Sequence, residues 1–291
     1  AVAEMWQAAN MAFALCPMLT SGAIEALIAH GSDQQRELYL SRMISGEWTG
    51  TMNLTEPQAG SDLSKVRSTA VLQEDGSYKI SGQKIFITYG DHEMTENIVH
   101  LVLARTPDAP AGVKGISLFI VPKYLVSDSG KIGARNDVTC VSLEHKLGIH
   151  GSPTAVLQFG DKGGATGFLV GEEGKGLAYM FTMMNNARLA VGQQGVAISE
   201  RSYQQALDYA NTRKQGRDAK TGEEAPIAVH GDVQRMLMRI RSSTDAARAL
   251  SLYAAAQLDL AHHLSDKQDR AAAQARADLL IPLVKGWATD I

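Results

Sequence analysis

The sequence predicts an α+β fold in which an antiparallel β domain, a barrel or sandwich, lies between two helical segments. Two changes in the spacing of apolar residues indicate this order. Near Thr49 helical spacing gives way to short β-rich runs, and after Gly174 helical spacing returns in long segments. We therefore expect part of an N-terminal helical domain at 1–47, the β domain at 48–170 and part of a C-terminal helical bundle at 171–291.

The first 46 residues are predicted to be helical. Apolar residues recur at helical spacing over 6–15 and again over 24–28. Gly31 ends this pattern, Ser32 offers an N-cap to a further helix, and Gly46 stops that helix.

Short β-rich runs follow between turn signals, with no long helix between them. These runs are 49–54, 66–72, 78–80, 84–88, 98–104, 116–121, 139–143 and 154–159. Asp75 and Gly76 form a hairpin signal between two of them. So many short runs indicate an antiparallel sandwich or barrel.

Three helices are predicted after residue 174, at about 180–209, 233–258 and 266–291. Their apolar residues recur at helical spacing, and short polar loops join them. Alanine-rich helices of this length are typical of an antiparallel bundle.

Composition excludes several classes of function. The 291 residues carry a formal net charge of −3, so no basic field favours a nucleic-acid partner. Cys16 and Cys140 are the only cysteines, and the histidines lack metal-ligand spacing, so we expect a reducing compartment and no metal site.

The ends of the sequence and its hydropathy suggest where the protein belongs. No run of about eighteen consecutive apolar residues is found, and no signal peptide opens the chain, so we expect no membrane span and a cytoplasmic location. The sequence begins at Ala1 without a methionine and ends at Ile291 inside a helical pattern. We expect a fragment that is truncated at both ends.

The run TEPQAGSD at residues 55–62 is one of the two most informative motifs. Pro57 and Gly60 break regular structure, while Thr55, Ser61 and nearby backbone N–H groups offer donors to a phosphate or a ring carbonyl. Turns of this composition also occur in ordinary loops, so the run alone leaves a structural role open.

A second run, GQKIFIT at residues 82–88, follows twenty residues later. Ile85 and Ile87 alternate with Phe86 and Thr88, so one strand face would present an aromatic ring beside a hydroxyl. That pair suits a flat ring with polar edges. Together the two runs resemble the flavin-binding signature of the acyl-CoA dehydrogenase family.

A third match runs from EHKLGIHGSPT at 144–154 to GEEGKG at 171–176, and resembles the passage from β domain to bundle in that family. The resemblance covers essentially the whole chain and implies the same order of helices, β domain and bundle. Within the family, the sequence is similar to the bacterial branch that includes 3-(methylthio)propanoyl-CoA dehydrogenases. A P-loop and a Rossmann glycine motif are both absent.

The resemblance implies FAD as the cofactor. Six residues of the β domain are implied to bind it, namely Met52, Leu54, Thr55, Ser61, Phe86 and Thr88. Ser61 corresponds to a residue that hydrogen-bonds the pyrophosphate, and the others to contacts with the ring. Many members carry tryptophan where this chain has Phe86, which can stack but lacks the indole N–H.

Residues outside the two runs are implied to complete the site. Arg213 corresponds to an arginine that reaches the FAD diphosphate of a neighbouring subunit, and Gln215 lies near the same contact. A cation at a helix C-terminus is also favoured by the helix dipole, which leaves a structural role open. Ser61, Ser152 and Arg188 are implied to lie beside the acyl-CoA substrate, although Ser152 also suits an ordinary turn.

The catalytic base is expected outside this chain. Removing hydrogen between the α and β carbons of a thioester needs a carboxylate for the α-proton and a flavin for the β-hydride. Most family members carry that glutamate in a Tyr-Glu-Gly-Thr run, which does not occur here, and a minority carry it where this chain has Ala187. We expect the base beyond Ile291, a structural role for Glu56 and little activity for the fragment alone.

The resemblance implies an FAD-dependent acyl-CoA dehydrogenase with an acyl-CoA substrate. It also implies an electron-transfer flavoprotein as electron acceptor and a homo-oligomer, either a dimer or a tetramer. Two alternatives stay open: an acyl-CoA oxidase that passes electrons to oxygen, and a flavin-binding relative that has lost catalysis. Solvent access to the flavin would identify the first, and the sequence after Ile291 the second.

Overall fold

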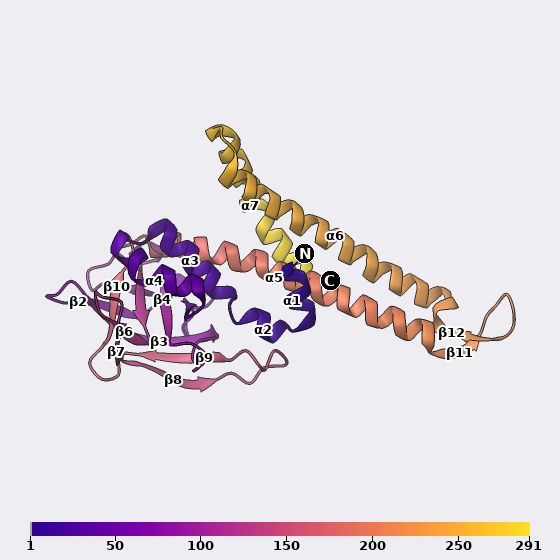
Figure 1. Ribbon diagram of the computed structural model, residues 1–291, viewed down its shortest axis with the longest axis horizontal. Helices are drawn as coiled ribbons and strands as arrows, with labels where there is room; N and C mark the ends of the chain where they lie inside the picture. The colour runs from indigo at the N-terminus through magenta and orange to yellow at the C-terminus, as the bar shows by residue number, and fades with distance from the viewer. Residues whose placement is uncertain (1) are drawn as a thin grey trace. The chain divides into compact units, whose positions relative to one another are not determined.

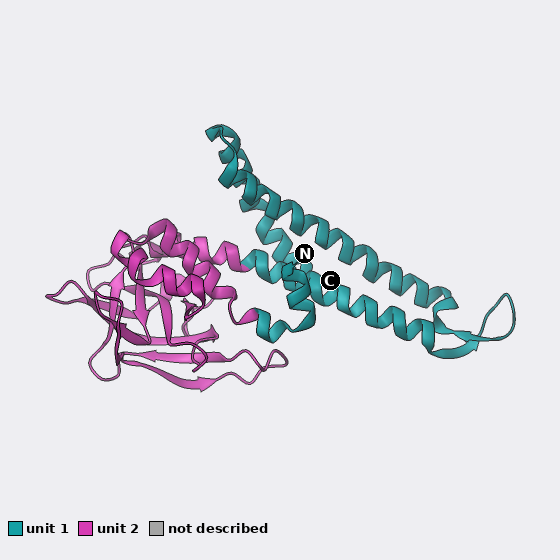
Figure 2. Ribbon diagram, viewed as in Figure 1, with its two compact units in different colours: residues 1–14, 188–291 teal, residues 15–187 magenta. Residues whose placement is uncertain are grey.

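The structure of the protein, a computed structural model, describes residues 2–291 (Figure 1). The chain forms two compact units: unit 1 comprises residues 1–14 and 188–291, and unit 2 comprises residues 15–187 (Figure 2). Unit 2 holds a large sheet, and unit 1 is mainly helical. The predicted order of helices, strands and helices along the chain is confirmed.

Helices α3 (Met18–His30) and α4 (Asp33–Ser45) precede the strands in unit 2. The predicted N-cap is confirmed: the Ser32 hydroxyl accepts a hydrogen bond from the Gln35 amide at 3.2 Å, and the Gln35 side chain accepts one from the Ser32 amide at 3.0 Å. Gly46 ends α4 with a left-handed φ of 83°, a conformation that glycine adopts without a steric cost.

The strands of unit 2 are β1 (Trp48–Asn53), β2 (Thr69–Leu72), β3 (Tyr78–Thr88), β4 (Asn97–Arg105), β5 (Ile116–Pro122), β6 (Tyr124–Val126), β7 (Ile132–Arg135), β8 (Val138–Leu143), β9 (Thr154–Phe159) and β10 (Ala165–Leu169). Two predicted runs, 78–80 and 84–88, form one continuous strand. Between residues 60 and 125, all of which are described, helical structure is confined to the 3-10 turns Leu63–Lys65 and Val113–Gly115, as predicted.

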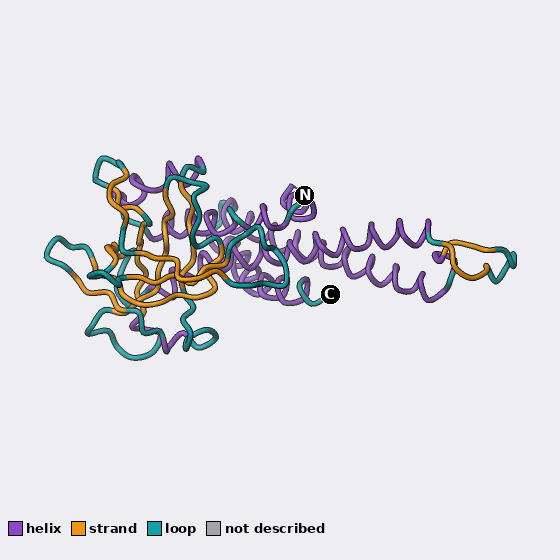
Figure 3. Tube along the Cα trace, turned by 90° about the horizontal axis from the view of Figure 1, so that it is seen from below, coloured by secondary structure: helices purple, strands orange, loops and turns teal. Residues whose placement is uncertain are grey.

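Five strands of unit 2 form a closed ring. β4, β5, β10, β3 and β2 pair in succession, and β2 also pairs with β4 where Thr69 meets Arg105. β1 extends the sheet beyond β4, while β9 and β8 extend it beyond β3, and Figure 3 shows these strands from a second direction. Most pairs are antiparallel as expected. Two pairs differ, because β2 and β4 meet in parallel at Thr69 and Arg105, and β1 and β4 pair in parallel along their length. The chain between β1 and β4 crosses through β2 and β3 instead of forming a hairpin.

Both faces of β4 are covered by apolar clusters. Leu101 and Leu103 belong to the cluster that contains Leu27 of α3, whereas Val102 and Ala104 belong to the cluster on the other face. Alternating residues of a strand point to opposite faces, so a strand with two buried faces is apolar throughout.

One helical window, Met11–His30, is long and apolar enough to cross a membrane by length and composition alone, with a mean hydropathy of 1.6. The sequence-based expectation overlooked it because Thr20 and Glu25 interrupt the apolar run. In its α3 part, Leu19 and Ala23 are buried in the core of unit 2.

Unit 1 contains α1 (Val2–Ala9), most of α5 (Gly176–Thr212), α6 (Gly231–His263) and α7 (Lys267–Ala288), with α2 (Met11–Leu15) at its boundary. The three predicted long helices are present. The Asp266 carboxylate caps α7 by accepting hydrogen bonds from the amides of Gln268 and Asp269. Where only a loop was expected, β11 (Lys214–Arg217) and β12 (Glu224–Pro226) form a hairpin.

Small residues let α5 and α7 approach closely. A Cβ atom added at Gly192 would lie 2.5 Å from the Val284 side chain, and one at Gly195 would lie 2.1 Å from the carbonyl oxygen of Ala288. The second distance involves backbone, which cannot rotate away as a side chain can. The packing of these two helices therefore requires glycine at position 195.

We predict that Gly195→Ala lowers the free energy of unfolding of the protein by about 1–3 kcal/mol, because the helices must separate. Gly286→Ala is the matched control: this helical glycine of α7 has nothing within 4 Å of an added Cβ. That change should raise stability by about 0.5–1 kcal/mol through helix propensity. Chemical denaturation of both variants checks this, and equal effects at the two positions would contradict the packing.

Candidate functional site

A buried glutamate holds the turn that contains the first motif. The Glu56 side chain is 3% exposed, and its carboxylate accepts five hydrogen bonds of 2.5–3.0 Å. The donors are Lys84 Nζ, the amide and hydroxyl of Ser68, the Arg67 amide and the Gln58 side chain. A carboxylate has about four lone-pair sites, so this one has no free position for proton transfer.

Lys84, from the second motif, is the charged partner of Glu56. Its side chain is fully buried, and Nζ lies 2.8 Å from Glu56 Oε1 and 3.1 Å from the carbonyl oxygen of Leu54. Burial lowers the pKa of Lys84 to about 8, against the opposing effect of the Glu56 charge. Burial alone would raise the pKa of Glu56, but the Lys84 charge and the hydrogen bonds outweigh it and lower that pKa to about 2. The two motifs therefore meet through an ion pair.

Strand β3 carries a bulge directly after Lys84. Lys84 pairs with Leu157 of β9, whereas Ile87 pairs with Ala155, so β3 has one extra residue in this interval. Phe86 takes a left-handed φ of 59° there, with its side chain 59% exposed. The sequence did not predict this bulge, which leaves Lys84 and Ile87 both buried, whereas the exposed Phe86 next to the buried Ile87 agrees with the alternation expected over 85–88.

A backbone hydrogen bond also joins the two motifs. The Ile85 amide donates to the Thr55 carbonyl at 2.9 Å, which ties the first turn directly to the bulged strand. A Cβ added at Gly60 would meet only a methyl group of Thr55, at 3.8 Å, so the backbone before Ser61 is open on that side.

Three hydroxyl groups of the two motifs are available to a ligand. In the part of the chain that the structure describes, no hydrogen bond engages the hydroxyl of Thr55, Ser61 or Thr88. Ser61 is exposed, and Thr55 and Thr88 are half-buried. With the exposed ring of Phe86, this set fits a flat heterocycle that carries a phosphate tail.

Met52 and Leu54, the other two predicted ring contacts, belong to the core that α3 and α4 cover. The Leu54 side chain is 8% exposed, and Met52 is half-buried against the same cluster. Their side chains mainly fix the position of β1, which leads into the turn.

Ser152 is fully buried, and its hydroxyl has no hydrogen-bond partner among the described residues. Lys146 Nζ donates to the Ser152 carbonyl oxygen and, at 3.0 Å, to the Thr154 hydroxyl. Because Thr154 pairs with Thr88 across β9 and β3, Ser152 belongs to the same part of unit 2 as the second motif.

Three predicted site residues belong to unit 1. Arg188 is half-buried on α5, where Ala187 occupies the position of the alternative base. Arg213 and Gln215 are exposed at the start of the β11–β12 hairpin. The Arg213 carbonyl accepts from the Ile227 amide at 2.8 Å, and the His230 ring nitrogen Nε2 lies 2.8 Å from the Gln215 carbonyl oxygen.

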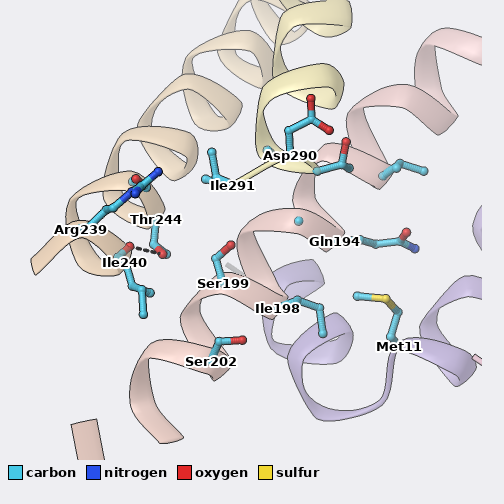
Figure 4. A pocket seen from close by; sticks show the side chains of 15 residues that line it. Met11, Gln194, Ile198, Ser199, Ser202, Arg239, Ile240, Thr244, Asp290 and Ile291 are labelled. Atoms are coloured by element: carbon cyan, nitrogen blue, oxygen red, sulfur yellow. Dashed lines mark hydrogen bonds between the residues drawn. The ribbon is translucent and has the colours of Figure 1, made fainter. Parts of the chain in front are cut away.

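Unit 1 also has a cavity of about 650 Å³ (Figure 4). Its lining comes from α5, α6, the end of α7 and Met11, and includes Ser199, Ser202 and Thr244. The Thr244 hydroxyl donates to the Ile240 carbonyl at 2.8 Å within α6. None of the predicted site residues lines this cavity.

Sequence reasoning missed Lys84 as a member of the site. One signal was available, because Lys84 shares strand parity with the buried residues Tyr78 and Ile80. A lysine at an inward strand position needs a buried acidic partner, and Glu56 in the neighbouring motif supplies it.

Comparison with known proteins relates the whole chain to one family. Residues 51–162 match the model described as acyl-CoA dehydrogenase, middle domain, and residues 174–279 match acyl-CoA dehydrogenase, C-terminal domain. The chain is 58% identical to a 3-methylmercaptopropionyl-CoA dehydrogenase of Ruegeria pomeroyi, over 100% of this chain and 49% of that protein. The chain spans about half the length of the curated relatives that it matches.

Solved structures are similar to this chain over nearly its whole length. An acyl-CoA dehydrogenase of Bacillus anthracis complexed with FAD is 26% identical, with a TM-score of 0.77 over 99% of this chain and 47% of the other. A structure described as the electron transferring flavoprotein of Acidaminococcus fermentans is 27% identical, with a TM-score of 0.74 over 98% of this chain and 69% of the other.

We predict that the Glu56–Lys84 pair gives stability a specific pH dependence. Because the pKa of Glu56 falls from 4.5 to about 2 on folding, its contribution is complete above about pH 4.5 and is lost as the pH falls toward 2. Glu56→Gln should lower the free energy of unfolding by about 3–5 kcal/mol at neutral pH, because it leaves Lys84 unpaired. The difference from the wild type should shrink in acid.

Denaturation curves at a series of pH values measure this difference. Glu37→Gln, at an exposed position of α4, is the control and should change stability by less than about 0.5 kcal/mol. A constant gap between the wild type and Glu56→Gln across the acid range would show that the Glu56 charge contributes nothing.

Proposed function

The chain belongs to the acyl-CoA dehydrogenase family, and we propose that the protein catalyses the FAD-dependent α,β-dehydrogenation of an acyl-CoA thioester. The observation that carries this proposal is the site in unit 2. There the buried Glu56–Lys84 pair joins two motifs whose Phe86 ring is exposed and whose hydroxyls make no hydrogen bond to the described residues. Bound FAD would supply the acceptor for the β-hydride.

Residues of this chain would hold the cofactor. We propose that Thr55, Thr88 and the Phe86 face bind the isoalloxazine ring, with Met52 and Leu54 shaping the strand beneath it. Ser61 would donate to the pyrophosphate, since its hydroxyl is exposed next to the open backbone of Gly60. Serine donors to a charged oxygen form the stronger class of hydrogen bond.

We propose that Arg213 binds the FAD diphosphate of a neighbouring subunit, so that the protein is a homo-oligomer, a dimer or a tetramer. Its exposure is consistent with a contact to another chain, and a guanidinium suits the geometry of phosphate. Gln215 would assist from the same hairpin. Ser152 and Arg188 would lie toward the acyl-CoA, and the fully buried Ser152 hydroxyl, which has no hydrogen-bond partner among the described residues, could bond to it only if the surrounding residues move.

The base would be a glutamate beyond Ile291. Glu56 is unsuitable, because five hydrogen bonds and a pKa of about 2 keep it a charged anchor. Ala187 cannot act as the base either, because its side chain has no ionisable group. Residues 1–291 would therefore bind and orient the cofactor, and on their own would turn over little substrate.

We propose 3-methylmercaptopropionyl-CoA as the first substrate to test, supported by the 58% identity over the whole chain. An electron-transfer flavoprotein is the proposed electron acceptor, and the cytoplasm is the proposed location.

We expect the full-length protein to carry bound flavin and to lose its visible absorbance when the thioester is added without oxygen. Air alone should restore that absorbance slowly. Fast reoxidation by air would indicate an oxidase, and a purified protein without flavin would contradict the proposal.

Two substitutions test the cofactor contacts. Ser61→Ala should weaken FAD binding by roughly 1.5–3 kcal/mol, because a donor to a charged oxygen is lost, and Arg213→Gln should weaken it through the partner chain. Ser129→Ala changes another exposed serine, and Lys220→Gln removes another exposed cation of the β11–β12 hairpin, so both serve as controls. FAD dissociation constants measured by flavin fluorescence would show whether each residue contributes to FAD binding. Unchanged affinity in Ser61→Ala would remove that residue from the site.

A further inference from the structure

The loop 89–96 connects β3 to β4 and begins directly after Thr88. None of its residues is part of the proposed site. Even so, it fixes the end of the strand that carries Phe86 and Thr88. Several contacts hold this loop in place, among them an ion pair of Glu96 with Arg42 and hydrogen bonds of Thr95, and the side chains of Lys123 and His92 add to these.

Lys123 follows β5 and is 3% exposed. Its ammonium group lies 2.8 Å from each of three oxygens: a carboxylate oxygen of Asp91, a carboxylate oxygen of Glu93 and the carbonyl oxygen of His92. An ammonium has three N–H donors, so all three are directed at consecutive residues of one loop. Burial opposes the charge of Lys123, but the hydrogen bonds and charges of Asp91 and Glu93 outweigh it and raise the pKa.

His92 ties the same loop to β1. The Met94 amide donates to His92 Nδ1 at 3.2 Å, so the ring proton is on Nε2, which lies 3.1 Å from the hydroxyl of Thr49. The ring also stacks on Tyr89, with centroids 3.8 Å apart. Burial, assisted by the charge of Lys123, lowers the pKa of His92 to about 4, so the ring is neutral at neutral pH.

The backbone near Thr88 needs such support. Phe86 has a φ of 59° and Tyr89 a φ of 52°, so left-handed residues lie on both sides of Ile87 and Thr88. Side chains with a Cβ rarely adopt this conformation, and it persists only where surrounding contacts enforce it. The Glu56–Lys84 ion pair and the hydrogen bond from the Ile85 amide to the Thr55 carbonyl fix the chain just before Phe86. Lys123 and His92 fix it just after Thr88.

We propose that Lys123 and His92 are positioning residues of the flavin site: by fixing loop 89–96 against β1 and β5, they keep Phe86 and Thr88 in the geometry that binds the ring. This inference rests on the proposed function. It explains why a lysine so deeply buried directs every donor at a loop that contains none of the proposed ligand-binding residues. It also links β1, which leads to Thr55, with the end of β3.

The experiment compares variants of the full-length protein. Lys123→Met keeps the length of the side chain and removes its charge, and Lys131→Met, at an exposed lysine of the β6–β7 hairpin, is the matched control. His92→Phe keeps the ring stacked on Tyr89 but loses the hydrogen bond to Thr49. His92→Gln keeps a group that can hydrogen-bond to Thr49 but loses the stacked ring. Three quantities are measured: the FAD dissociation constant, the visible circular dichroism of the flavin at saturating FAD, and the melting temperature of the apoprotein.

We expect Lys123→Met to raise the FAD dissociation constant about tenfold, equivalent to about 1.4 kcal/mol, and to change the dichroism of fully bound flavin. The two His92 variants should each show smaller changes of the same kind, and Lys131→Met none. A lower melting temperature with unchanged affinity and dichroism would overturn the inference, because the residues would then be structural only. If Lys123→Met does not fold, the two His92 variants decide by the same criterion.

The result also separates this inference from the proposed function. A wild-type protein that does not bind FAD would refute the proposed function itself. A wild type that binds FAD, together with variants that bind it equally well and with the same dichroism, would refute only the positioning roles.

Discussion

A lysine and a glutamate that are both removed from solvent hold the turn 54–62 against strand β3. Burying two charges costs several kcal/mol for each ion, so such a pair contributes little net stability compared with well-packed apolar residues. Its effect is geometric. Lys84 can satisfy its charge only where Glu56 and the Leu54 carbonyl meet it, which fixes how the turn and the strand face each other. Beside that arrangement, the hydroxyls of Thr55 and Thr88 make no hydrogen bond to any described residue, and the ring of Phe86 is exposed.

The same principle recurs at the other end of the strand, where Lys123 binds Asp91, His92 and Glu93. Between these two buried lysines the chain makes a bulge and adopts two left-handed residues, Phe86 and Tyr89. Strained backbone tends to occur where structure is pre-organised for binding. Unit 2 can therefore hold the residues proposed to bind the ring in a fixed geometry without any ligand to order them. This also explains why charged residues, which are rarely buried, occur in its interior.

Much of this fold could be predicted from the sequence, because its signals are local. Ser32 and Gly46 delimit α4, and the change in apolar period near Thr49 marks the first strand, as the structure confirms. The parallel pairing of β1 with β4 depends on contacts between distant segments, which no local pattern contains. Strand β10 was missed because its five residues include Gly167 and lack an alternating pattern. The bulge at Phe86 was missed because alternation was assumed, and the pairing of Lys84 with Glu56 because each motif was interpreted alone.

If the Glu56–Lys84 pair makes one flavin site out of two motifs, the two side chains must be coupled in FAD binding. A double-mutant cycle measures this coupling, with Glu56→Gln, Lys84→Met and the combined variant of the full-length protein. If the pair couples the motifs, each single change weakens FAD binding, and the double variant binds more tightly than the sum of the two losses predicts. The coupling energy should reach about 0.5–3 kcal/mol. Purely additive losses, or single variants that lose stability but bind FAD as the wild type does, would contradict the account.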